Sequence, residues 1–386
     1  MKFTIVFGYR NRDLQRVKRC FDSLAKQTFR DFEVIFTDYG SEKEPARAAA
    51  ALCAEYDFVR YVYNATTGLP WNRSHALNTG ARLAASEYII FGDVDLIYAT
   101  NFLAVVNTSA SPDINLYGEY YHLPQSFNRW DDIATLNAAD FASFGPAGKG
   151  GVHIVHRAKL EYVGGYDEFY CFWGVEDRDL HHRLTAIGLQ ETWLSKEAPV
   201  FHQWHPLTSD FYNSGFPLQW WEDVNIYFER NKSVLQRNRK GWGQLMQPSE
   251  RSAINETYAV HEVVLKCQDA IYGIGGKSAT LTLIYQHLNT LTAGTRLCFI
   301  YQPEKSHVFP AEVVQQRIFS RVVVKDSDWT RIQQQFERYS RRLNHFIPDE
   351  DLLYIFREIT LQDDRFDYAF IKTDNEWRWY FALKQL

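Results

Sequence analysis

Two carboxylates that follow a short apolar segment are the first residues here whose types and spacing suggest chemistry. The run Tyr88–Phe91 is typical of a buried strand, and Gly92 separates it from Asp93 and Asp95. Because an unpaired charge is very costly inside a sheet, both carboxylates are expected at the carboxyl end of the strand, facing a crevice. Oxygen ligands at this D-x-D spacing suit a divalent cation. A lone D-x-D also occurs in ordinary turns, so the rest of the chain must support the metal interpretation.

Further acids and two histidines fall where predicted elements begin or end. They are Asp38, Glu176, Asp177, His202 and His205. Asp38 ends a second apolar run, and the acid pair occupies the expected first turn of a helix, where the helix dipole favours a carboxylate. Two histidines three residues apart, beside a tryptophan, favour metal ligation. Simpler interpretations stay open: acids that only respond to the helix dipole, and half-exposed histidines of a β-hairpin.

Strands and helices alternate in the first hundred residues, and these elements must position the candidate groups. Strands are predicted at 3–7, 31–37, 58–63 and before the D-x-D, with helices from Asp13, from Pro45, and from a Ser74 cap to about Ala85. This alternation indicates right-handed βαβ units and a parallel sheet. The sequence therefore predicts an α/β fold whose first part is a Rossmann-like, nucleotide-binding half.

The pattern loosens beyond residue 100. Residues 111–151 are rich in aromatic residues, Gly and Pro, which favours loops and irregular sheet over the site, and a strand is expected at 152–155. Residues 207–250 are interpreted as a connection. Further elements are predicted at 280–291, 296–301, 329–343 and 366–383. We therefore expect two domains: a catalytic domain over 1–245 and a smaller α/β domain of unassigned role over 250–386.

Composition narrows the class of protein and its partners. The 386 residues carry a formal net charge of −5 and are 46% hydrophobic, which is typical of a globular protein and argues against nucleic acid as a partner. The first residues are interpreted as a strand, not a signal peptide. No apolar run approaches the roughly 18 residues of a membrane span, so peripheral membrane association stays open. Five widely spaced cysteines favour reduced thiols and a cytoplasmic location.

An ordered set of motifs resembles the family 2 glycosyltransferases of the GT-A fold. They are Tyr9-Arg-Asn-Arg12 after the first strand, Asp38 in Thr-Asp-Tyr-Gly-Ser, and Phe91-Gly-Asp-Val-Asp-Leu96. Trp173-Gly-Val-Glu-Asp177 and His202-x-x-His205 add a similarity to β-1,4-galactosyltransferases and chondroitin-polymerising enzymes. The resemblance covers roughly residues 1–210, and the region after about 250 resembles no family.

The resemblance implies roles on the donor side of a site. Asp38 would hydrogen-bond the uracil of a UDP-sugar, Asp93 would lie near the ribose and the metal, and Asp95 would coordinate the cation. His202 and His205 match positions that supply later metal ligands, although the galactosyltransferases have methionine where His202 stands. The residues expected to line the nucleotide or sugar are Tyr9, Arg10, Arg12, Arg73 and Trp173.

The resemblance also implies roles on the acceptor side. Asp177 matches the catalytic base, and Glu176 matches its neighbour that contacts the acceptor. Between Gly174 and this acid pair the chain has Val175, where the family has glycine, and a larger side chain there would narrow an acceptor pocket.

The chemistry of sugar transfer explains why these residue types are needed. Breaking the C–O bond of a nucleotide sugar passes through an oxocarbenium-like transition state, while negative charge grows on the departing diphosphate. A divalent ion stabilises that charge, and carboxylate plus imidazole ligands suit Mn²⁺, with Mg²⁺ as the alternative. A carboxylate on the opposite side of the sugar removes the acceptor proton, which gives inversion in one displacement.

The predicted function is inverting, metal-dependent transfer of a sugar from a UDP-sugar to a glycan or other hydroxyl acceptor, in polysaccharide biosynthesis. Two other classes stay open. One is a catalytically silent nucleotide-sugar sensor or glycan-binding scaffold that acts through the C-terminal domain. The other is a nucleotidylyltransferase, which would normally have a glycine-rich loop where this chain has Tyr9-Arg-Asn-Arg12.

Overall fold

The chain divides into two compact units, each described here by itself. Unit 1 comprises Met1–Leu207 and Asp223–Gln247, and unit 2 comprises Thr208–Glu222 and Pro248–Leu386. The computed structural model describes residues 1–130, 136, 138–143, 150–171, 174–194, 196–205, 218–239, 241–265, 282–301, 359, 363–372 and 376–384.

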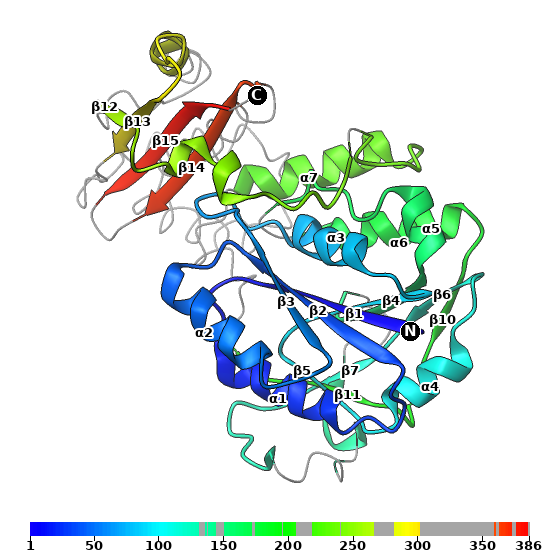
Figure 1. The fold of residues 1–386 in the computed structure, drawn as a ribbon. Helices are drawn as coiled ribbons and strands as arrows, with labels where there is room; N and C mark the ends of the chain where they lie inside the picture. The colour runs from blue at the N-terminus through cyan, green and yellow to red at the C-terminus, as the bar shows by residue number, and fades with distance from the viewer. Residues whose placement is uncertain are drawn as a thin grey trace, which may run out of the picture. The chain divides into compact units, whose positions relative to one another are not determined.

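Seven strands form the central sheet of unit 1, in the order β10-β6-β9-β4-β1-β2-β3 (Figure 1). Their bounds are β1 Phe3–Tyr9, β2 Phe32–Tyr39, β3 Val59–Asn64, β4 Tyr88–Gly92, β6 Ile114–Tyr117, β9 Val152–His156 and β10 Gln190–Trp193. β1 pairs in parallel with β2 and β4, and β2 with β3, whereas β9 runs antiparallel to β4 and β6. The sheet is therefore mostly parallel, which confirms the predicted α/β class.

Helices cover both faces of this sheet, because alternate residues of each central strand point to opposite sides. Ile5 packs in the core that contains residues of α1, α2 and α4, and Val6 packs in the core that contains residues of α3, α5 and α6 (Figure 1). The helices are α1 Leu14–Ala25, α2 Lys43–Cys53, α3 Arg73–Leu83, α4 Phe102–Ser109, α5 Arg157–Val163, α6 Glu176–Ala186 and α7 Leu218–Asn231. The boundary between the two units falls inside α7.

The starts of the helices follow local chemistry, with one correction. The helix predicted from Asp13 is α1, and Asp13 caps it, because its side chain accepts the backbone N–H of Gln15 at 3.0 Å. The prediction that Ser74 caps α3 is wrong. Asn72 has an extended backbone and its side chain accepts the N–H of His75 at 2.8 Å, so α3 begins at Arg73. This shift places Arg73 in the first helical turn, where it can reach the site.

A smaller sheet within unit 1 has the order β5-β11-β7-β8. Its strands are β5 Leu96–Tyr98, β7 Tyr120–His122, β8 Ala142–Ser143 and β11 Val200–His202. β11 pairs with β5 on one side and β7 on the other, so His202 lies opposite Leu96, the residue after Asp95. Residues 111–151, expected to be loop and irregular sheet, thus contribute β6 to the central sheet and β7 and β8 to this one.

Unit 2 contains a separate sheet in the order β12-β13-β15-β14. Its strands are β12 Ala259–Leu265, β13 Thr295–Tyr301, β14 Phe366–Lys372 and β15 Trp377–Leu383. One face is closed by Phe299, Trp379 and Phe381, against Ile284 and Leu288 of the helical stretch at 282–288. The helix predicted at 329–343 lies outside the described residues.

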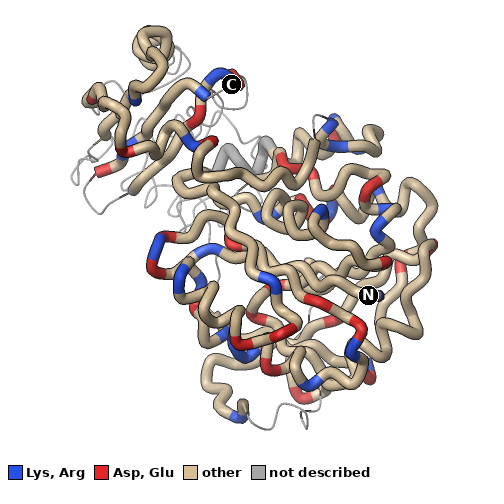
Figure 2. Tube along the Cα trace, viewed as in Figure 1, with Lys and Arg blue, Asp and Glu red and all other residues tan. Residues whose placement is uncertain are grey.

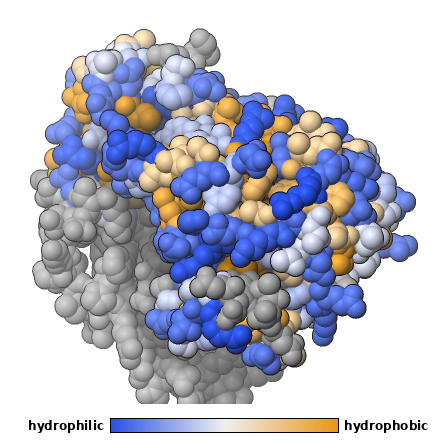
Figure 3. All heavy atoms as spheres, turned by 60° about the horizontal axis from the view of Figure 1, so that its bottom comes forward, coloured by the Kyte–Doolittle hydropathy of each residue, from blue (hydrophilic) through white to orange (hydrophobic). Residues whose placement is uncertain are grey.

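The charges of the described chain are mixed in sign. Acidic and basic residues are interspersed along the described trace in the view of Figure 2. On the face turned forward in Figure 3, apolar patches are interrupted by hydrophilic residues. Among the described residues, no helix has the length and apolar character needed to cross a membrane.

Candidate active site

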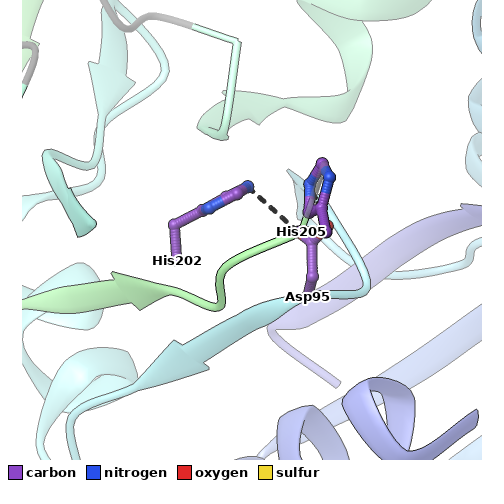
Figure 4. A group of neighbouring side chains, drawn as sticks. All are labelled: Asp95, His202 and His205. Atoms are coloured by element: carbon purple, nitrogen blue, oxygen red, sulfur yellow. Dashed lines mark ion pairs between the residues drawn. The ribbon is translucent and has the colours of Figure 1, made fainter. Parts of the chain in front are cut away.

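A carboxylate and two imidazoles converge at the edge of the smaller sheet. Asp95 lies in the turn between β4 and β5, His202 ends β11, and His205 follows three residues later. Nε2 of His205 lies 3.1 Å from Oδ2 of Asp95, and Nε2 of His202 lies 3.6 Å from Oδ1 (Figure 4). One ligand atom from each residue fits within 4.8 Å of the others. These three residues form the Asp–His–His cluster.

The Asp–His–His cluster has the donor set and the electrostatics of a cation site. Its side chains are only 15–20% exposed, and Oδ1 of Asp95 is buried with no hydrogen-bond partner among the described residues, as expected of an atom placed to bind an ion. Burial alone would raise the pKa of Asp95, but the hydrogen bond with His205 and the charges of both histidines lower it. An ionised carboxylate and two imidazoles fit Mn²⁺ or a similar divalent ion.

Arg73 joins the other half of the D-x-D to the predicted catalytic base. Its guanidinium lies 3.1 Å from Oδ1 of Asp93 and 3.0 Å from Oδ1 of Asp177, and it donates to the carbonyl of Gly150 at 2.9 Å. Asp93 therefore lies with Arg73, while Asp95 lies with His202 and His205. The two acids of the D-x-D face two different groups of residues.

Asp177 is held through one of its oxygens by two hydrogen bonds. Oδ1 accepts from Arg73 and, at 3.1 Å, from the hydroxyl of Tyr166. Oδ2 faces Gly150, and a Cβ at that position would collide with it. The side chain is 27% exposed. A carboxylate oriented through one oxygen, with the other oxygen outside those two bonds, has the geometry needed to accept a proton from a hydroxyl group.

Tyr166 and Gly150 are site residues that the sequence did not single out. Tyr166 follows Gly164 and Gly165, which both adopt positive φ and so allow a sharp turn after α5. The two consecutive glycines before Tyr166 were the sequence feature that could have indicated this turn. No sequence feature could have indicated Gly150, because its role depends on the backbone passing beside Asp177.

Glu176 lies next to Asp177 in the first turn of α6, but its side chain is buried. It is 6% exposed, and within the part of the chain that the structure describes Oε2 has no hydrogen-bond partner. Burial, together with the charge of Asp177, raises the pKa of Glu176 to about 7, although Arg73 opposes this shift. Before it, Val175 has φ of 72°, which is a strained conformation for a β-branched residue. The start of α6 is thus a strained turn that carries a carboxyl group able to change charge near neutral pH.

The raised pKa of Glu176 predicts a pH dependence of stability. The folded state holds this proton up to about pH 7, whereas the unfolded chain releases it near 4.5, so the free energy of unfolding should fall as pH rises between these values. The slope from this group is about 1.4 kcal/mol for each pH unit. We expect Glu176→Gln to flatten the curve in that window, measured by urea unfolding at several pH values. An unchanged slope would contradict the assignment.

Two buried arginines fix α6 in place. Arg183 donates to Asp179 at 2.8 Å and to the carbonyls of Val163 and Gly165, and Arg237 pairs with Asp179 at 2.9 Å. Arg183 and Asp179 are fully buried. Charges buried in this way persist only when they are well paired. The pairing ties α6 to the turn that carries Tyr166, which fixes Asp177 relative to its hydroxyl partner.

The residues predicted to bind the nucleotide lie at the carboxyl ends of β1 and β2. Asp38 is fully buried and accepts from the N–H of Ser41 and from the hydroxyl of Tyr61, each at 2.8 Å. Burial raises its pKa, against the effect of these hydrogen bonds. Tyr9 is also buried, and its hydroxyl donates to the carbonyl of Arg12 at 3.0 Å.

The two arginines after β1 differ in their surroundings. Arg10 donates to the carbonyls of Thr66 and Leu69, and its guanidinium lies 4.8 Å from the ring centre of Tyr39, so it joins β1 to the loop after β3. Arg12 is exposed. Trp173, predicted to pack against the sugar, lies outside the described residues.

The structure therefore brings two chemical groups to neighbouring positions. The Asp–His–His cluster offers a cation site, and the pair Arg73–Asp177 offers a positioned carboxylate, with Asp93 next to both. Such a site can hold a diphosphate through a metal ion and deprotonate a hydroxyl on the other side.

Known families match the two segments that carry these groups. Residues 4–130 match the family described as glycosyl transferase family 2, and residues 133–205 match the N-terminal domain of galactosyltransferase. The first match contains the D-x-D, and the second contains Glu176, Asp177, His202 and His205.

Individual relatives are distant. Chondroitin sulfate synthase 3 of Mus musculus is 26% identical over 157 residues, which is 37% of this chain and 17% of that protein. Beta-1,4-galactosyltransferase 7 of Drosophila melanogaster is 24% identical over 134 residues, 34% of this chain and 36% of that protein. The chain thus spans about one sixth and about one third of the lengths of these relatives.

Solved structures with a partial likeness include GalNAc-T7 with UDP, GalNAc and Mn²⁺. Its TM-score is 0.42 at 17% identity, covering 63% of this chain and 53% of that one. The mannosyltransferase PcManGT from Pyrobaculum calidifontis, with GDP-Man and Mn²⁺, has a TM-score of 0.41 at 14% identity, covering 88% and 86%. The family matches over residues 4–130 and 133–205 therefore make this part of the chain similar to glycosyltransferases of the family 2 and galactosyltransferase types.

Proposed function

We propose that this chain is an inverting, metal-dependent enzyme that moves a sugar from a UDP-sugar to a hydroxyl group of a glycan acceptor. One observation supports it above the others. Arg73 links Asp177 to Asp93, which stands two residues before Asp95 of the Asp–His–His cluster. A single displacement needs this arrangement, with the leaving group held on one side of the sugar and the base on the other.

Asp95, His202 and His205 are the residues that would hold the metal. A divalent ion bound to the diphosphate supplies Lewis-acid stabilisation of the negative charge that develops there. The protein fixes the ligands from two paired strands, because His202 and Leu96 are register partners of β11 and β5. This pairing supports a preformed site. The mixed carboxylate and imidazole set favours Mn²⁺ over Ca²⁺.

Asp177 accepts the proton of the attacking hydroxyl in this proposal. Tyr166 and Arg73 orient it through Oδ1, which leaves Oδ2 for the acceptor. The ion pair with Arg73 also occupies one oxygen of Asp177. If Arg73 remains paired with Asp177 when a donor is bound, this ion pair favours the second candidate function, a catalytically silent nucleotide-sugar sensor. In the enzyme, Arg73 would turn toward the donor, whose phosphates compete for its N–H groups.

The names of the relatives support a glycan acceptor. A chondroitin sulfate synthase and a β-1,4-galactosyltransferase each match about a third of this chain. The uracil of the donor would lie near Asp38, at the carboxyl end of β2. Glu176, beside Asp177 in the first turn of α6, would then lie on the acceptor side of the site.

A nucleotide panel tests the proposal. The melting temperature of the whole protein is measured with UDP, GDP, ADP and CDP, each with and without Mn²⁺. We expect UDP with Mn²⁺ to give the largest increase, because the metal and the diphosphate bind together. A UDP effect that is equal with and without Mn²⁺ would contradict the metal assignment. UDP-sugars that stabilise the protein are then tested for transfer, and binding without any turnover would support the sensor instead.

A further inference from the structure

A cavity of about 340 Å³ opens beside the Asp–His–His cluster, on the side of α1. Its lining includes Arg16, Arg19, Trp130, Gln203 and Trp204, and it reaches His205. No sequence motif pointed to it. We call it the arginine–tryptophan cavity.

Arg19 is the most distinctive group in this cavity. Its guanidinium lies 3.7 Å from the ring centre of Trp130, so it stacks on the aromatic face. It also donates to Oε1 of Gln203 at 3.4 Å. Among the described residues no carboxylate forms an ion pair with it, although the charge of Asp13, which also lines the cavity, acts on it. A stacked arginine keeps its N–H edge for a ligand, and that edge matches the oxygens of a carboxylate or phosphate.

One wall of the cavity is held in place by the buried side-chain amide of Gln203. Gln203 is 1% exposed, its side chain donates to the carbonyl of Arg16 at 3.0 Å, and its backbone N–H donates to the carbonyl of Asp95 at 3.0 Å. One residue thus connects α1, the D-x-D turn and the segment carrying both histidines.

Arg16 and Trp204 complete the chemistry. Arg16 lies one helical turn before Arg19, and its pairing with Asp13 at 3.3 Å on the surface leaves part of its charge for a ligand. The positive charge of Arg16 also helps to lower the pKa of Asp95. Trp204 is 44% exposed between the two metal-binding positions. An exposed indole beside cations offers a flat surface to a sugar ring.

We propose that the arginine–tryptophan cavity binds an oxyanion carried by a saccharide ligand, a phosphate or a carboxylate, with Arg19 as its main partner. The anion comes from one of two sources: the diphosphate of the donor or an acidic sugar unit. Identifying the carrier as a saccharide rests on the proposed function, whereas anion binding does not. The affinity falls as ionic strength rises, because arginine charges carry it.

The experiment titrates the whole protein with two probes. Inorganic pyrophosphate represents the donor, and a disaccharide ending in glucuronate represents an acidic sugar, with its neutral glucose-ended counterpart as reference. The variants are Arg19→Gln, Arg19→Lys and Trp204→Ala. Arg82→Gln is the matched control, because Arg82 also lies over a tryptophan, Trp242, at 5.8 Å, but in α3.

We expect Arg19→Gln to weaken the affinity for one probe by about tenfold or more. Arg19→Lys should weaken this affinity less, because lysine keeps the positive charge but lacks the paired N–H groups of a guanidinium that bind two oxygens at once. Loss of pyrophosphate binding with no effect of Trp204→Ala supports the diphosphate as source. Loss of glucuronate binding in both Arg19→Gln and Trp204→Ala supports an acidic sugar. Melting temperatures verify that each variant is folded.

The proposal is overturned if neither probe binds, or if Arg19→Gln binds both probes as Arg82→Gln does. These results are separate from failure of the proposed function. If the parent protein binds UDP in a Mn²⁺-dependent way and Arg19→Gln has no effect on either probe, the oxyanion site is contradicted and the proposed transferase function is not. If Arg19→Gln weakens binding of a probe but the parent protein shows no Mn²⁺-dependent UDP binding, the oxyanion site is supported and the proposed transferase function is contradicted.

Discussion

Replacing Asp177 by asparagine is expected to lower sugar transfer by about 10²-fold to 10⁴-fold, the range for removing a general base. Asparagine keeps the shape of the side chain and can still accept from Tyr166 and Arg73, so the fold of α6 should persist. It cannot accept the acceptor proton. Binding of UDP with Mn²⁺ should remain within a few-fold of the parent protein, because the Asp–His–His cluster is intact.

The measurement compares initial rates of transfer with UDP affinity by calorimetry in the same preparations. If the rate fell only a few-fold, Asp177 would not be the catalytic base, and its carboxylate would only interact favourably with the dipole at the start of α6. Equal losses of rate and UDP affinity would mean that Asp177 acts through Arg73 on the donor, not as a base.

Replacing Asp95 by asparagine is expected to abolish the part of UDP affinity that depends on Mn²⁺. The amide has almost the same size but no charge, and an uncharged oxygen is a much weaker ligand for a divalent ion. Since stabilisation of the leaving diphosphate by a metal is worth several kcal/mol, transfer should fall by 10²-fold or more. Asp113→Asn is the control, because Asp113 is 82% exposed, lies 3.5 Å from Lys159 and is remote from the Asp–His–His cluster in sequence.

Calorimetric titration of UDP at several Mn²⁺ concentrations measures the effect of Asp95→Asn directly. His202→Ala and His205→Ala belong in the same series. The 3.1 Å separation of His205 from Asp95, against 3.6 Å for His202, predicts the larger loss for His205→Ala. Unchanged metal dependence in Asp95→Asn would place the cation elsewhere.

Part of this site could be predicted from the sequence because its residue types are chemically distinctive and stand at the ends of elements. Asp95, His202 and His205 were predicted in this way, and the structure brings one ligand atom of each within 4.8 Å of the others. The D-x-D as a unit was less informative. Asp93 and Asp95 are separated by one residue, yet they face different partners, and spacing alone does not reveal the direction of a side chain in a turn.

The rest depended on contacts between residues far apart in the chain. Arg73 and Asp177 are separated by 104 positions, and their ion pair results from packing α3 and α6 on the same face of the sheet. The direction of β9 was equally inaccessible, because an apolar strand has the same pattern whether it runs parallel or antiparallel. Asn72 and Ser74 are both good cap residues, so local composition could not decide where α3 begins.

The anomeric configuration of the transferred sugar tests the central claim most directly. With a UDP-sugar identified by the nucleotide panel, the configuration at the anomeric carbon of the product is determined by NMR. A leaving group held at the Asp–His–His cluster and a base at Asp177 predict inversion, so an α-linked donor gives a β-linked product. A product with retained configuration would contradict the account, because a single displacement with Asp177 as base cannot produce it.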